Sequence, residues 1–213
     1  MKNGKKRTRS ASLAVLLAAL LLSSACGEAN APDGQIFFSG MTLKNGTTLV
    51  TDDGGSDLIE GLGLIVVNLP EGSEKPAAGS GVSYVIEDRL GELYPPHAWA
   101  VSFEVGDESK SVKTSLEIAE RIREHDPSNT VIIDVRTAEE FAAGHVPSAL
   151  LLPLADLPGN LPDYPSDTNI IVYCRSGNRS ATAADILHQA GFKIVIDAGG
   201  ILGYAGEIIV PSD

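Results

Sequence analysis

The sequence predicts a small all-β, barrel-like domain at residues 35–106, followed by an α/β domain at residues 107–213. Residues 35–105 consist of short apolar runs separated by glycine- and asparagine-containing turns, a pattern typical of small β domains. From residue 114 onward, apolar runs alternate with segments of helical pattern, which favours a mostly parallel sheet flanked by helices. The 213 residues are enough for two small domains that each bury a core.

Residues 1–25 have the pattern of a bacterial lipoprotein signal peptide. Five lysines and arginines, with no acid, precede an apolar run of 12 residues, which is shorter than the roughly 20 residues of a membrane span. The sequence Leu22-Ser-Ser-Ala-Cys26 then resembles a lipobox. This resemblance implies a lipid on Cys26, a tether at residues 26–34 and a protein anchored on the extracytoplasmic face of the cell membrane. Ordinary signal-peptide cleavage would instead leave a secreted protein with a free Cys26 thiol.

The net charge argues against nucleic acid as a partner. The chain has 16 lysines and arginines against 28 acids, a net charge of -12, which becomes -17 when the five positive charges of residues 1–25 are removed. Binding to phosphate backbones requires an excess of cations. Any contact with a membrane therefore has to come from the lipid rather than from a basic surface. Cys26 and Cys174 are too few for a disulfide framework or a four-cysteine zinc site, and we expect no metal and no cofactor.

The first domain is expected to contain five strands. They are predicted at residues 36–38, 47–50, 62–69, 82–86 and 99–105. The segment Tyr94-Pro-Pro-His-Ala-Trp-Ala-Val-Ser-Phe-Glu-Val105 resembles the closing segment of a small uncharacterised β domain of Gram-positive lipoproteins, a family without established chemistry. Trp99 lies on an alternating strand, so we expect it in the core rather than in a binding site, and His97 is interpreted in the same way.

In the second half, a polar linker is expected at residues 106–113, and two capping boxes mark helix starts. Thr114-Ser-Leu-Glu117 predicts a helix to about His125, and Thr137-Ala-Glu-Glu140 predicts a short helix that ends near Gly144. The other elements are predicted as strands at 131–135, 149–154, 169–173 and 193–197, and a helix at 180–190 with Gly191 as its C-cap.

Cys174 ends one of these apolar strands and precedes a glycine-containing loop that opens a helix. Backbone N–H groups of such a loop converge, and the positive end of the helix adds to them, so a thiol there loses its proton easily. Arg175 and Arg179 favour a thiolate and an anionic sulfur donor. A lone buried cysteine is more often inert packing, but this context favours a functional residue.

Several motifs in order and spacing resemble the rhodanese family of sulfurtransferases over roughly residues 112–211. They are Asp134-Val-Arg136, Glu139-Glu-Phe-Ala-Ala-Gly-His-Val-Pro-Ser-Ala149, Tyr173-Cys-Arg-Ser-Gly-Asn-Arg-Ser180, Gly191-Phe192 and Gly199-Gly-Ile201. The resemblance implies a single rhodanese-like α/β domain with a five-stranded sheet. Tyr204 stands near the position where the family usually has a tryptophan.

The resemblance also implies a reaction. Cys174 would accept sulfane sulfur from thiosulfate or a related small anionic donor, form a persulfide, and pass the sulfur to cyanide or to a thiol, including a thiol on a protein. The loop Arg175, Ser176, Gly177, Asn178 and Arg179 would bind the substrate through its N–H groups and cations. A persulfide anion stabilised in this way needs no proton shuttle, which agrees with the lack of a candidate base beside Cys174.

Three further residues are given structural roles. Asp134 and Arg136 are expected to anchor the strand end by hydrogen bonds, with a substrate role as the alternative. His145, in Gly-His-Val-Pro, is expected to be a turn or packing residue.

The sequence around Cys174 favours sulfur transfer over two other cysteine chemistries. In related cysteine phosphatases the arginine follows the cysteine by six positions, whereas Arg179 follows Cys174 by five, so the shorter loop favours a single sulfur atom over a phosphate. A thiol-disulfide oxidoreductase requires a nearby second cysteine, which the sequence lacks. A non-catalytic module on the cell surface that binds an anion or persulfide, or senses sulfide, remains open.

Overall fold

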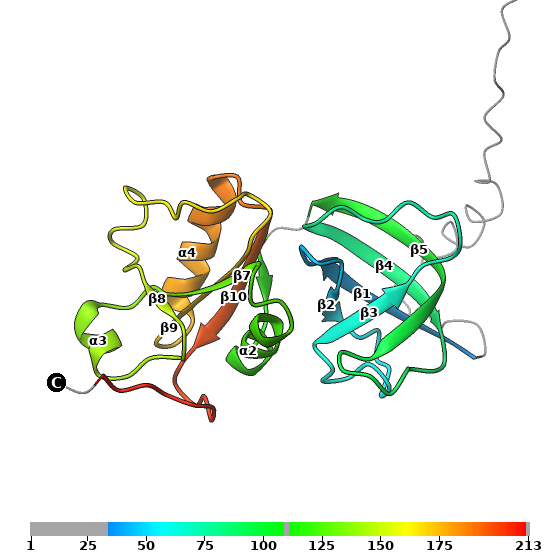
Figure 1. The fold of residues 1–213 in the computed structure, drawn as a ribbon, viewed down its shortest axis with the longest axis horizontal. Helices are drawn as coiled ribbons and strands as arrows, with labels where there is room; N and C mark the ends of the chain where they lie inside the picture. The colour runs from blue at the N-terminus through cyan, green and yellow to red at the C-terminus, as the bar shows by residue number, and fades with distance from the viewer. Residues whose placement is uncertain (1–33, 109–110, 212–213) are drawn as a thin grey trace, which may run out of the picture.

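The computed structural model describes residues 34–108 and 111–211, which form two domains that lie side by side (Figure 1). A β-barrel precedes an α/β domain, in the order that the sequence predicts. The predicted signal peptide at residues 1–25, Cys26 and the tether up to residue 33 lie outside the described residues. Among the residues that are described, no helix has the length and apolar character needed to cross a membrane.

Five strands close the barrel in the order β1-β2-β3-β5-β4. They are β1 (Gln35–Thr42), β2 (Thr48–Asp52), β3 (Leu64–Asn68), β4 (Ser80–Glu87) and β5 (His97–Glu108). Neighbouring strands are antiparallel except β3 and β5, which are parallel. Alternate residues of β4 point into the barrel, where Tyr84 stacks on Phe38 with ring centroids 5.1 Å apart. Each predicted strand is present, and closure leaves none of them at an unpaired edge.

The prediction that Trp99 is a core residue is wrong. Its neighbour Ala98 is fully buried in the barrel cluster, and successive side chains of a strand point to opposite faces. Trp99 is therefore on the outer face, only partly buried, with the Arg89 guanidinium 4.5 Å from its ring centroid. The cation covers the ring, an arrangement that an apolar/polar pattern does not reveal.

The second domain has a five-stranded sheet in the order β6-β10-β9-β7-β8. Every neighbouring pair is parallel. Its strands are β6 (Val112–Lys113), β7 (Thr130–Asp134), β8 (Leu150–Leu151), β9 (Asn169–Cys174) and β10 (Ile194–Gly200). Its helices are α2 (Leu116–His125), α3 (Ala138–Ala142) and α4 (Asn178–Gln189). The strand β8 is shorter than predicted, although the N–H groups of Leu152 and Leu154 still donate to Asp134 O and Val135 O after β7.

The two faces of this sheet are covered by different helices. Along β9, Ile171 and Tyr173 belong to the buried cluster that contains the apolar face of α2. The alternating residues Ile170, Val172 and Cys174 belong to the cluster that contains α4. This period of two is expected for a strand buried on both faces, and it places the Cys174 side chain on the α4 side.

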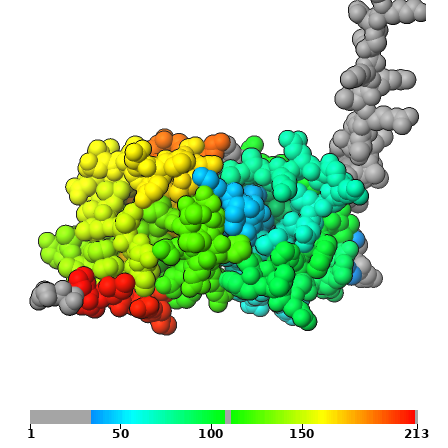
Figure 2. Space-filling view, in the orientation of Figure 1, coloured from blue at the N-terminus to red at the C-terminus, as the bar shows by residue number. Residues whose placement is uncertain are grey.

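The barrel covers the other side of α2, so a single buried apolar cluster spans both domains. Its barrel members are Met41, Leu43, Leu49 and Leu64, and its α2 members are Leu116, Ala119 and Ile122. On the face shown in Figure 2, the atoms of the two domains meet without a gap. The helix α2 is therefore enclosed between the sheet and the barrel.

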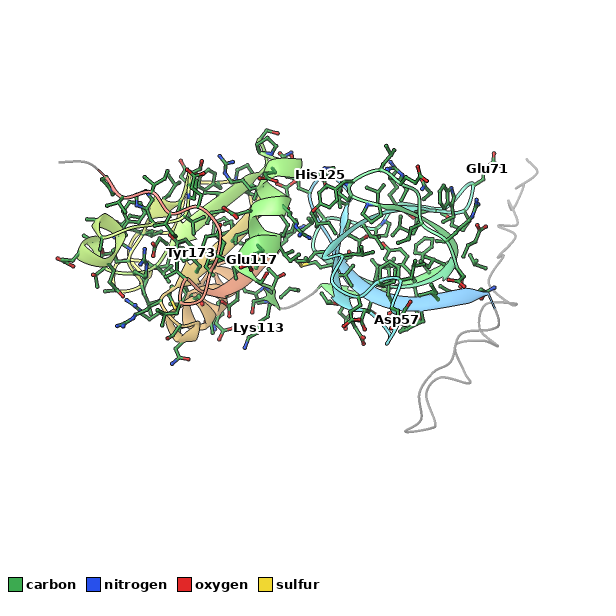
Figure 3. All side chains as sticks on the ribbon, turned by 90° about the horizontal axis from the view of Figure 1, so that it is seen from below. Asp57, Glu71, Lys113, Glu117, His125 and Tyr173 are labelled. Atoms are coloured by element: carbon green, nitrogen blue, oxygen red, sulfur yellow. The ribbon has the colours of Figure 1, made fainter. Side chains whose placement is uncertain are left out.

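Polar contacts flank this shared cluster. The Lys44 ammonium group lies 2.9 Å from an Asp167 carboxylate oxygen, and the Lys44 backbone N–H donates to Asn169 Oδ1 at 3.1 Å. His125 stands at the end of α2 beside the barrel (Figure 3), with its Nε2 3.1 Å from Thr47 Oγ1. These contacts fix the orientation of the barrel on the α/β domain.

The residues around the domain junction differ from the prediction. Instead of a linker at residues 106–113, β5 continues to Glu108, which pairs with Ser80, and β6 pairs with β10. The first capping box is also wrong. The Thr114 N–H donates to Asp197 O as the β6 ladder continues, so the N-cap of α2 is Ser115, one residue later.

Two other helix boundaries agree more closely with the prediction. The capping box of Thr137 and Glu140 at the start of α3 is confirmed. The helix α4 ends at a C-cap on Ala190, and Gly191 follows it in the left-handed conformation.

Candidate functional site

Cys174 is the last residue of β9, at the carboxyl end of the central strand of the parallel sheet. Its side chain is only 1% exposed. Gly177, the N-cap of α4, has a φ of 99°, a conformation that suits glycine. This turn directs the Gly177 N–H to the sulfur, and the N–H donates to Cys174 Sγ at 3.1 Å.

The surroundings of the sulfur favour the thiolate. Burial raises the pKa of the Cys174 thiol, whereas the N–H groups of Ser180, Ser176 and Gly177 and the Ser180 hydroxyl lower it. The lowering contributions are larger in sum, so the pKa of Cys174 lies below its ordinary value. The predicted cradle of N–H groups is thus present, and it faces the sulfur at the N-terminus of α4.

Ser180 joins the loop to the end of β10. Its hydroxyl lies 2.9 Å from Gly177 O and 3.1 Å from Gly199 O. Because a hydroxyl has a single proton, Ser180 donates to one of these carbonyls or to the sulfur at a given moment. Ser180 is fully buried, so it orients the first turn of α4 beneath the thiol.

Gly200 packs directly against the backbone of the cysteine loop. A β-carbon at this position would lie 2.6 Å from Arg175 O and 2.6 Å from Ser176 Cα. The backbone after β10 also holds the loop, since Ile201 N–H donates to Cys174 O at 2.9 Å and Leu202 N–H to Arg175 O at 3.1 Å. Only glycine permits this close approach of two backbones.

The two arginines of the loop have different surroundings. Arg175 is exposed and forms no ion pair with any described residue. Arg179 forms a bidentate pair with Glu140, with distances of 2.7 and 2.8 Å. The Arg179 guanidinium holds the pKa of Glu140 down to about 2. Within the described chain, Arg175 is therefore the cation of the loop that no carboxylate neutralises.

The other two loop residues lie on the surface. Ser176 is exposed and contributes its backbone N–H to the sulfur. Asn178, the first residue of α4, is exposed, and its carbonyl accepts a hydrogen bond from Thr182 Oγ1 at 3.3 Å. The Asn178 side chain has no hydrogen bond to a described residue.

Asp134 and Arg136 anchor the strand next to β9, as predicted. Arg136 donates through Nη2 to Asp134 Oδ2 at 2.7 Å, and Asp134 is completely buried. Arg136 Nη2 also donates to Gly144 O at 2.6 Å, which ties the loop after α3 to β7. The predicted packing role of His145 is likewise confirmed, because its ring stacks on Phe141 at 3.7 Å and its Nδ1 lies 3.0 Å from Phe141 O.

A small apolar cavity of about 290 Å³ adjoins the loop. Its lining residues are Val135, Arg136, Thr137, Pro153, Leu154, Ala155 and Arg179. Arg179 is the residue that the cavity shares with the cysteine loop. Among the described residues, no histidine or carboxylate hydrogen-bonds to Cys174, and no group of three potential metal ligands occurs.

Three residues of the site were not predicted as functional. Glu140 was assigned only as a capping residue, and its pairing with Arg179 joins positions 39 residues apart, which no local pattern shows. Ser180 enters the sequence interpretation only as the last residue of the cysteine-loop motif and the first residue of the predicted helix. Gly200 belongs to the motif Gly199-Gly-Ile201, and a glycine pair after an apolar strand is a signal of a close backbone approach.

The lowered pKa of Cys174 predicts a shift in its titration. The thiolate should form with a midpoint below that of an unperturbed cysteine, and Ser180→Ala should move this midpoint upward because a stabilising donor is lost. The difference in ultraviolet thiolate absorbance between the protein from residue 27 onward and its Cys174→Ser variant measures the titration. A midpoint at or above the ordinary value, or no change in Ser180→Ala, would contradict this account.

A second prediction concerns Glu140. Glu140→Gln keeps a side chain that can cap Thr137 but leaves Arg179 without its carboxylate. Because the pair is about one-third exposed, we expect a gain of roughly 3- to 10-fold in kcat/KM for thiosulfate. The kcat/KM for dimethyl trisulfide, a neutral sulfur donor, should not change. Glu139→Gln, which removes a neighbouring charge that does not contact Arg179, is the matched control. An equal change for both donors would argue against a role for the freed charge.

Comparisons with known proteins agree with this site. The model of the rhodanese-like domain family matches residues 114–207. A protein named "Sulfurtransferase" from Allochromatium vinosum is 38% identical over 81 residues, which are 38% of this chain and 76% of that protein. The "Putative sulfurtransferase YtwF" of Bacillus subtilis is 37% identical over 76 residues, covering 36% of this chain and 74% of the relative.

A solved structure, titled a rhodanese-like domain protein from Staphylococcus aureus, is 27% identical with a TM-score of 0.40. The match covers 49% of this chain and all of that one (100%). The family match spans residues 114–207, which include the cysteine loop and the residues that support it. The chain therefore belongs to the rhodanese-like family.

Proposed function

We propose that this chain transfers sulfane sulfur through Cys174. The thiolate attacks the outer sulfur of thiosulfate, the S–S bond of the donor breaks, and sulfite leaves with the bonding electron pair. Cys174 then carries a persulfide whose terminal sulfur is an anion. Cyanide or a thiolate attacks this sulfur, the Cys174 S–S bond breaks, and its electrons return to the thiolate.

The observation that carries this proposal is the set of N–H groups around the sulfur. The Gly177 N–H already donates to Cys174 Sγ, and the Ser176 and Ser180 N–H groups also lower the pKa of the thiol. Prearranged donors of this kind stabilise an anionic sulfur without any movement of a proton. Arg175, exposed and unpaired among the described side chains, is the group best placed to attract an anionic donor. The names of the relatives support the same reaction class.

Cys174→Ser tests the proposal. Serine preserves the size of the side chain but is a far weaker nucleophile, so sulfur transfer from thiosulfate to cyanide should fall at least about 10³-fold. Mass spectrometry of the unaltered protein after thiosulfate treatment should show one added sulfur atom on Cys174. Equal rates in the two proteins would reject the proposal. A persulfide that forms but is not passed on to cyanide or to thiols would indicate the alternative, a non-catalytic persulfide-binding or sensing module.

We also propose that the protein is lipid-anchored through Cys26 on the extracytoplasmic face of the membrane. The support is the basic segment, the apolar run and the cysteine at the end of residues 1–26. Metabolic labelling with a radioactive fatty acid should mark the protein, and Cys26→Ser should abolish the label and release the protein into the medium. An unlabelled protein that is secreted in both forms would show ordinary signal-peptide cleavage.

A further inference from the structure

A cavity lies in the barrel domain, and none of its lining residues belongs to the cysteine loop. Its volume is about 760 Å³, within the range of about 300–1,000 Å³ typical of small-molecule sites. It opens where β1 and β3 end, under the segment that joins β3 to β4. His125 of α2 also lines it, so the cavity is completed by the α/β domain. Figure 3 labels His125 and Glu71, two lining residues at opposite ends of the barrel.

Hydroxyl groups lie where the cavity meets the barrel core. Thr42 and Tyr84 line it and are buried, with exposures of 4% and 2%. Tyr84 Oη is 3.2 Å from Thr48 Oγ1, and either hydroxyl can donate to the other. Thr42 Oγ1 lies near Tyr84 but makes no hydrogen bond of normal geometry with the described residues. A buried hydroxyl without a partner costs about 1–3 kcal/mol, a cost that a polar ligand atom at this position would remove.

Burial raises the pKa of Tyr84, and the hydroxyls of Thr48 and Thr42 lower it by less. Tyr84 is therefore a neutral hydroxyl at physiological pH. Together with Thr42 it can offer a proton to a ligand oxygen.

The cations of the barrel domain are concentrated at this cavity. Residues 35–106 contain only three lysines or arginines, and two of them, Lys44 and Lys75, line it. Lys44 is paired with Asp167, while Lys75 has no ion pair with any residue that the structure describes. Glu71 is exposed, and its side chain points to solvent in Figure 3. A cation in this position favours an anionic ligand even on an acidic protein, because physiological salt screens charges beyond about 8 Å.

Much of the remaining wall is apolar, including Leu43, Val66, Leu69 and Pro76. We propose that the cavity binds a small organic acid, with its carboxylate at Lys75, its apolar body against these side chains and a polar atom at Thr42. The barrel is then a ligand-binding domain attached to the rhodanese-like domain. This inference is independent of sulfur transfer, since none of its residues touches the cysteine loop.

A pair of matched probes tests the charge requirement. Phenylacetate and its neutral counterpart phenylacetamide are titrated into ¹⁵N-labelled protein from residue 27 onward, which contains every described residue. Saturable shifts are expected at the backbone amides of Gly46 and Gly72, which line the cavity. Phenylacetate should bind at least about tenfold more tightly than phenylacetamide. Absence of saturation with phenylacetate, or equal affinities for the two probes, would overturn the proposal.

Two variants test the assigned contacts. Lys75→Gln should remove the preference for phenylacetate over phenylacetamide. Thr42→Val, which preserves the side-chain shape, should weaken the binding of both probes. Lys113→Gln, which removes an exposed lysine outside the cavity, should leave both affinities unchanged. Amide spectra of the free variants show whether each is folded. Unaltered binding by folded Lys75→Gln and Thr42→Val proteins would place the probe elsewhere and reject the site.

Discussion

Replacing Gly200 by alanine is expected to lower kcat/KM for thiosulfate roughly 10²-fold, the loss associated with a misplacement of about 1 Å in an active site. The new β-carbon would lie 2.6 Å from Arg175 O and from Ser176 Cα, so the loop has to move away from β10. That movement separates the Ser176 and Gly177 N–H groups from the sulfur. Steady-state kinetics with thiosulfate and cyanide measure the effect, and the thiolate titration should shift upward in parallel.

Gly159→Ala is the matched control for this experiment. Its β-carbon would meet only Asp156 O, at the ordinary contact distance of 3.8 Å. Activity and melting temperature should therefore stay close to those of the unaltered protein. If Gly200→Ala retained its activity within about twofold, the support of the cysteine loop by β10 would not matter for positioning the thiol.

Asp134→Asn is expected to destabilise the protein by about 3–5 kcal/mol, because it leaves the Arg136 charge buried without its partner. Asp134 is completely buried, and it accepts hydrogen bonds from the Arg136 backbone N–H, Nε and Nη2. Asparagine has the same shape but cannot offer two charged acceptor oxygens. Urea denaturation followed by circular dichroism gives the free energy of unfolding.

The chain offers a control of the same spacing. Glu87 and Arg89 also pair an acid with an arginine two positions later, but both side chains are largely exposed. Glu87→Gln should change the free energy of unfolding by no more than about 1 kcal/mol. If the two variants lost similar amounts of unfolding free energy, burial of Asp134 and Arg136 would not explain the destabilisation.

Local sequence patterns predicted the strands and turns well. They failed where contacts with residues distant in the sequence determine a helix boundary or the direction of a side chain. The Thr137–Glu140 capping box uses only neighbouring residues and is present as predicted. The Thr114–Glu117 box has the same pattern, but a hydrogen bond from Thr114 to Asp197 on β10 holds Thr114 in the sheet. Tryptophan is a residue type common in protein cores, yet the position of Trp99 on β5 directs its side chain outward, where Arg89 covers the ring. The competing contact in each case comes from another element.

In the candidate site, too, the features set by neighbouring residues were predictable and those set by distant residues were not. The strand, loop and helix around Cys174 are contiguous in the sequence, so their conformation and the N–H groups at the sulfur followed from glycine and helix geometry. The ion pair of Arg179 did not follow from local sequence, since its partner Glu140 lies on α3. The role of Gly200 depends on how closely β10 approaches the loop, a distance that emerges only from the packed sheet.

The enclosure of α2 limits how portable the rhodanese-like domain is. A fragment cut at the family boundaries would keep the cysteine loop, but it would uncover the side of α2 that Met41, Leu43 and Leu64 now seal. Newly bared apolar surface of this kind promotes self-association. The barrel therefore also stabilises the α/β domain by covering α2, so engineering of the rhodanese-like domain should keep the two domains together.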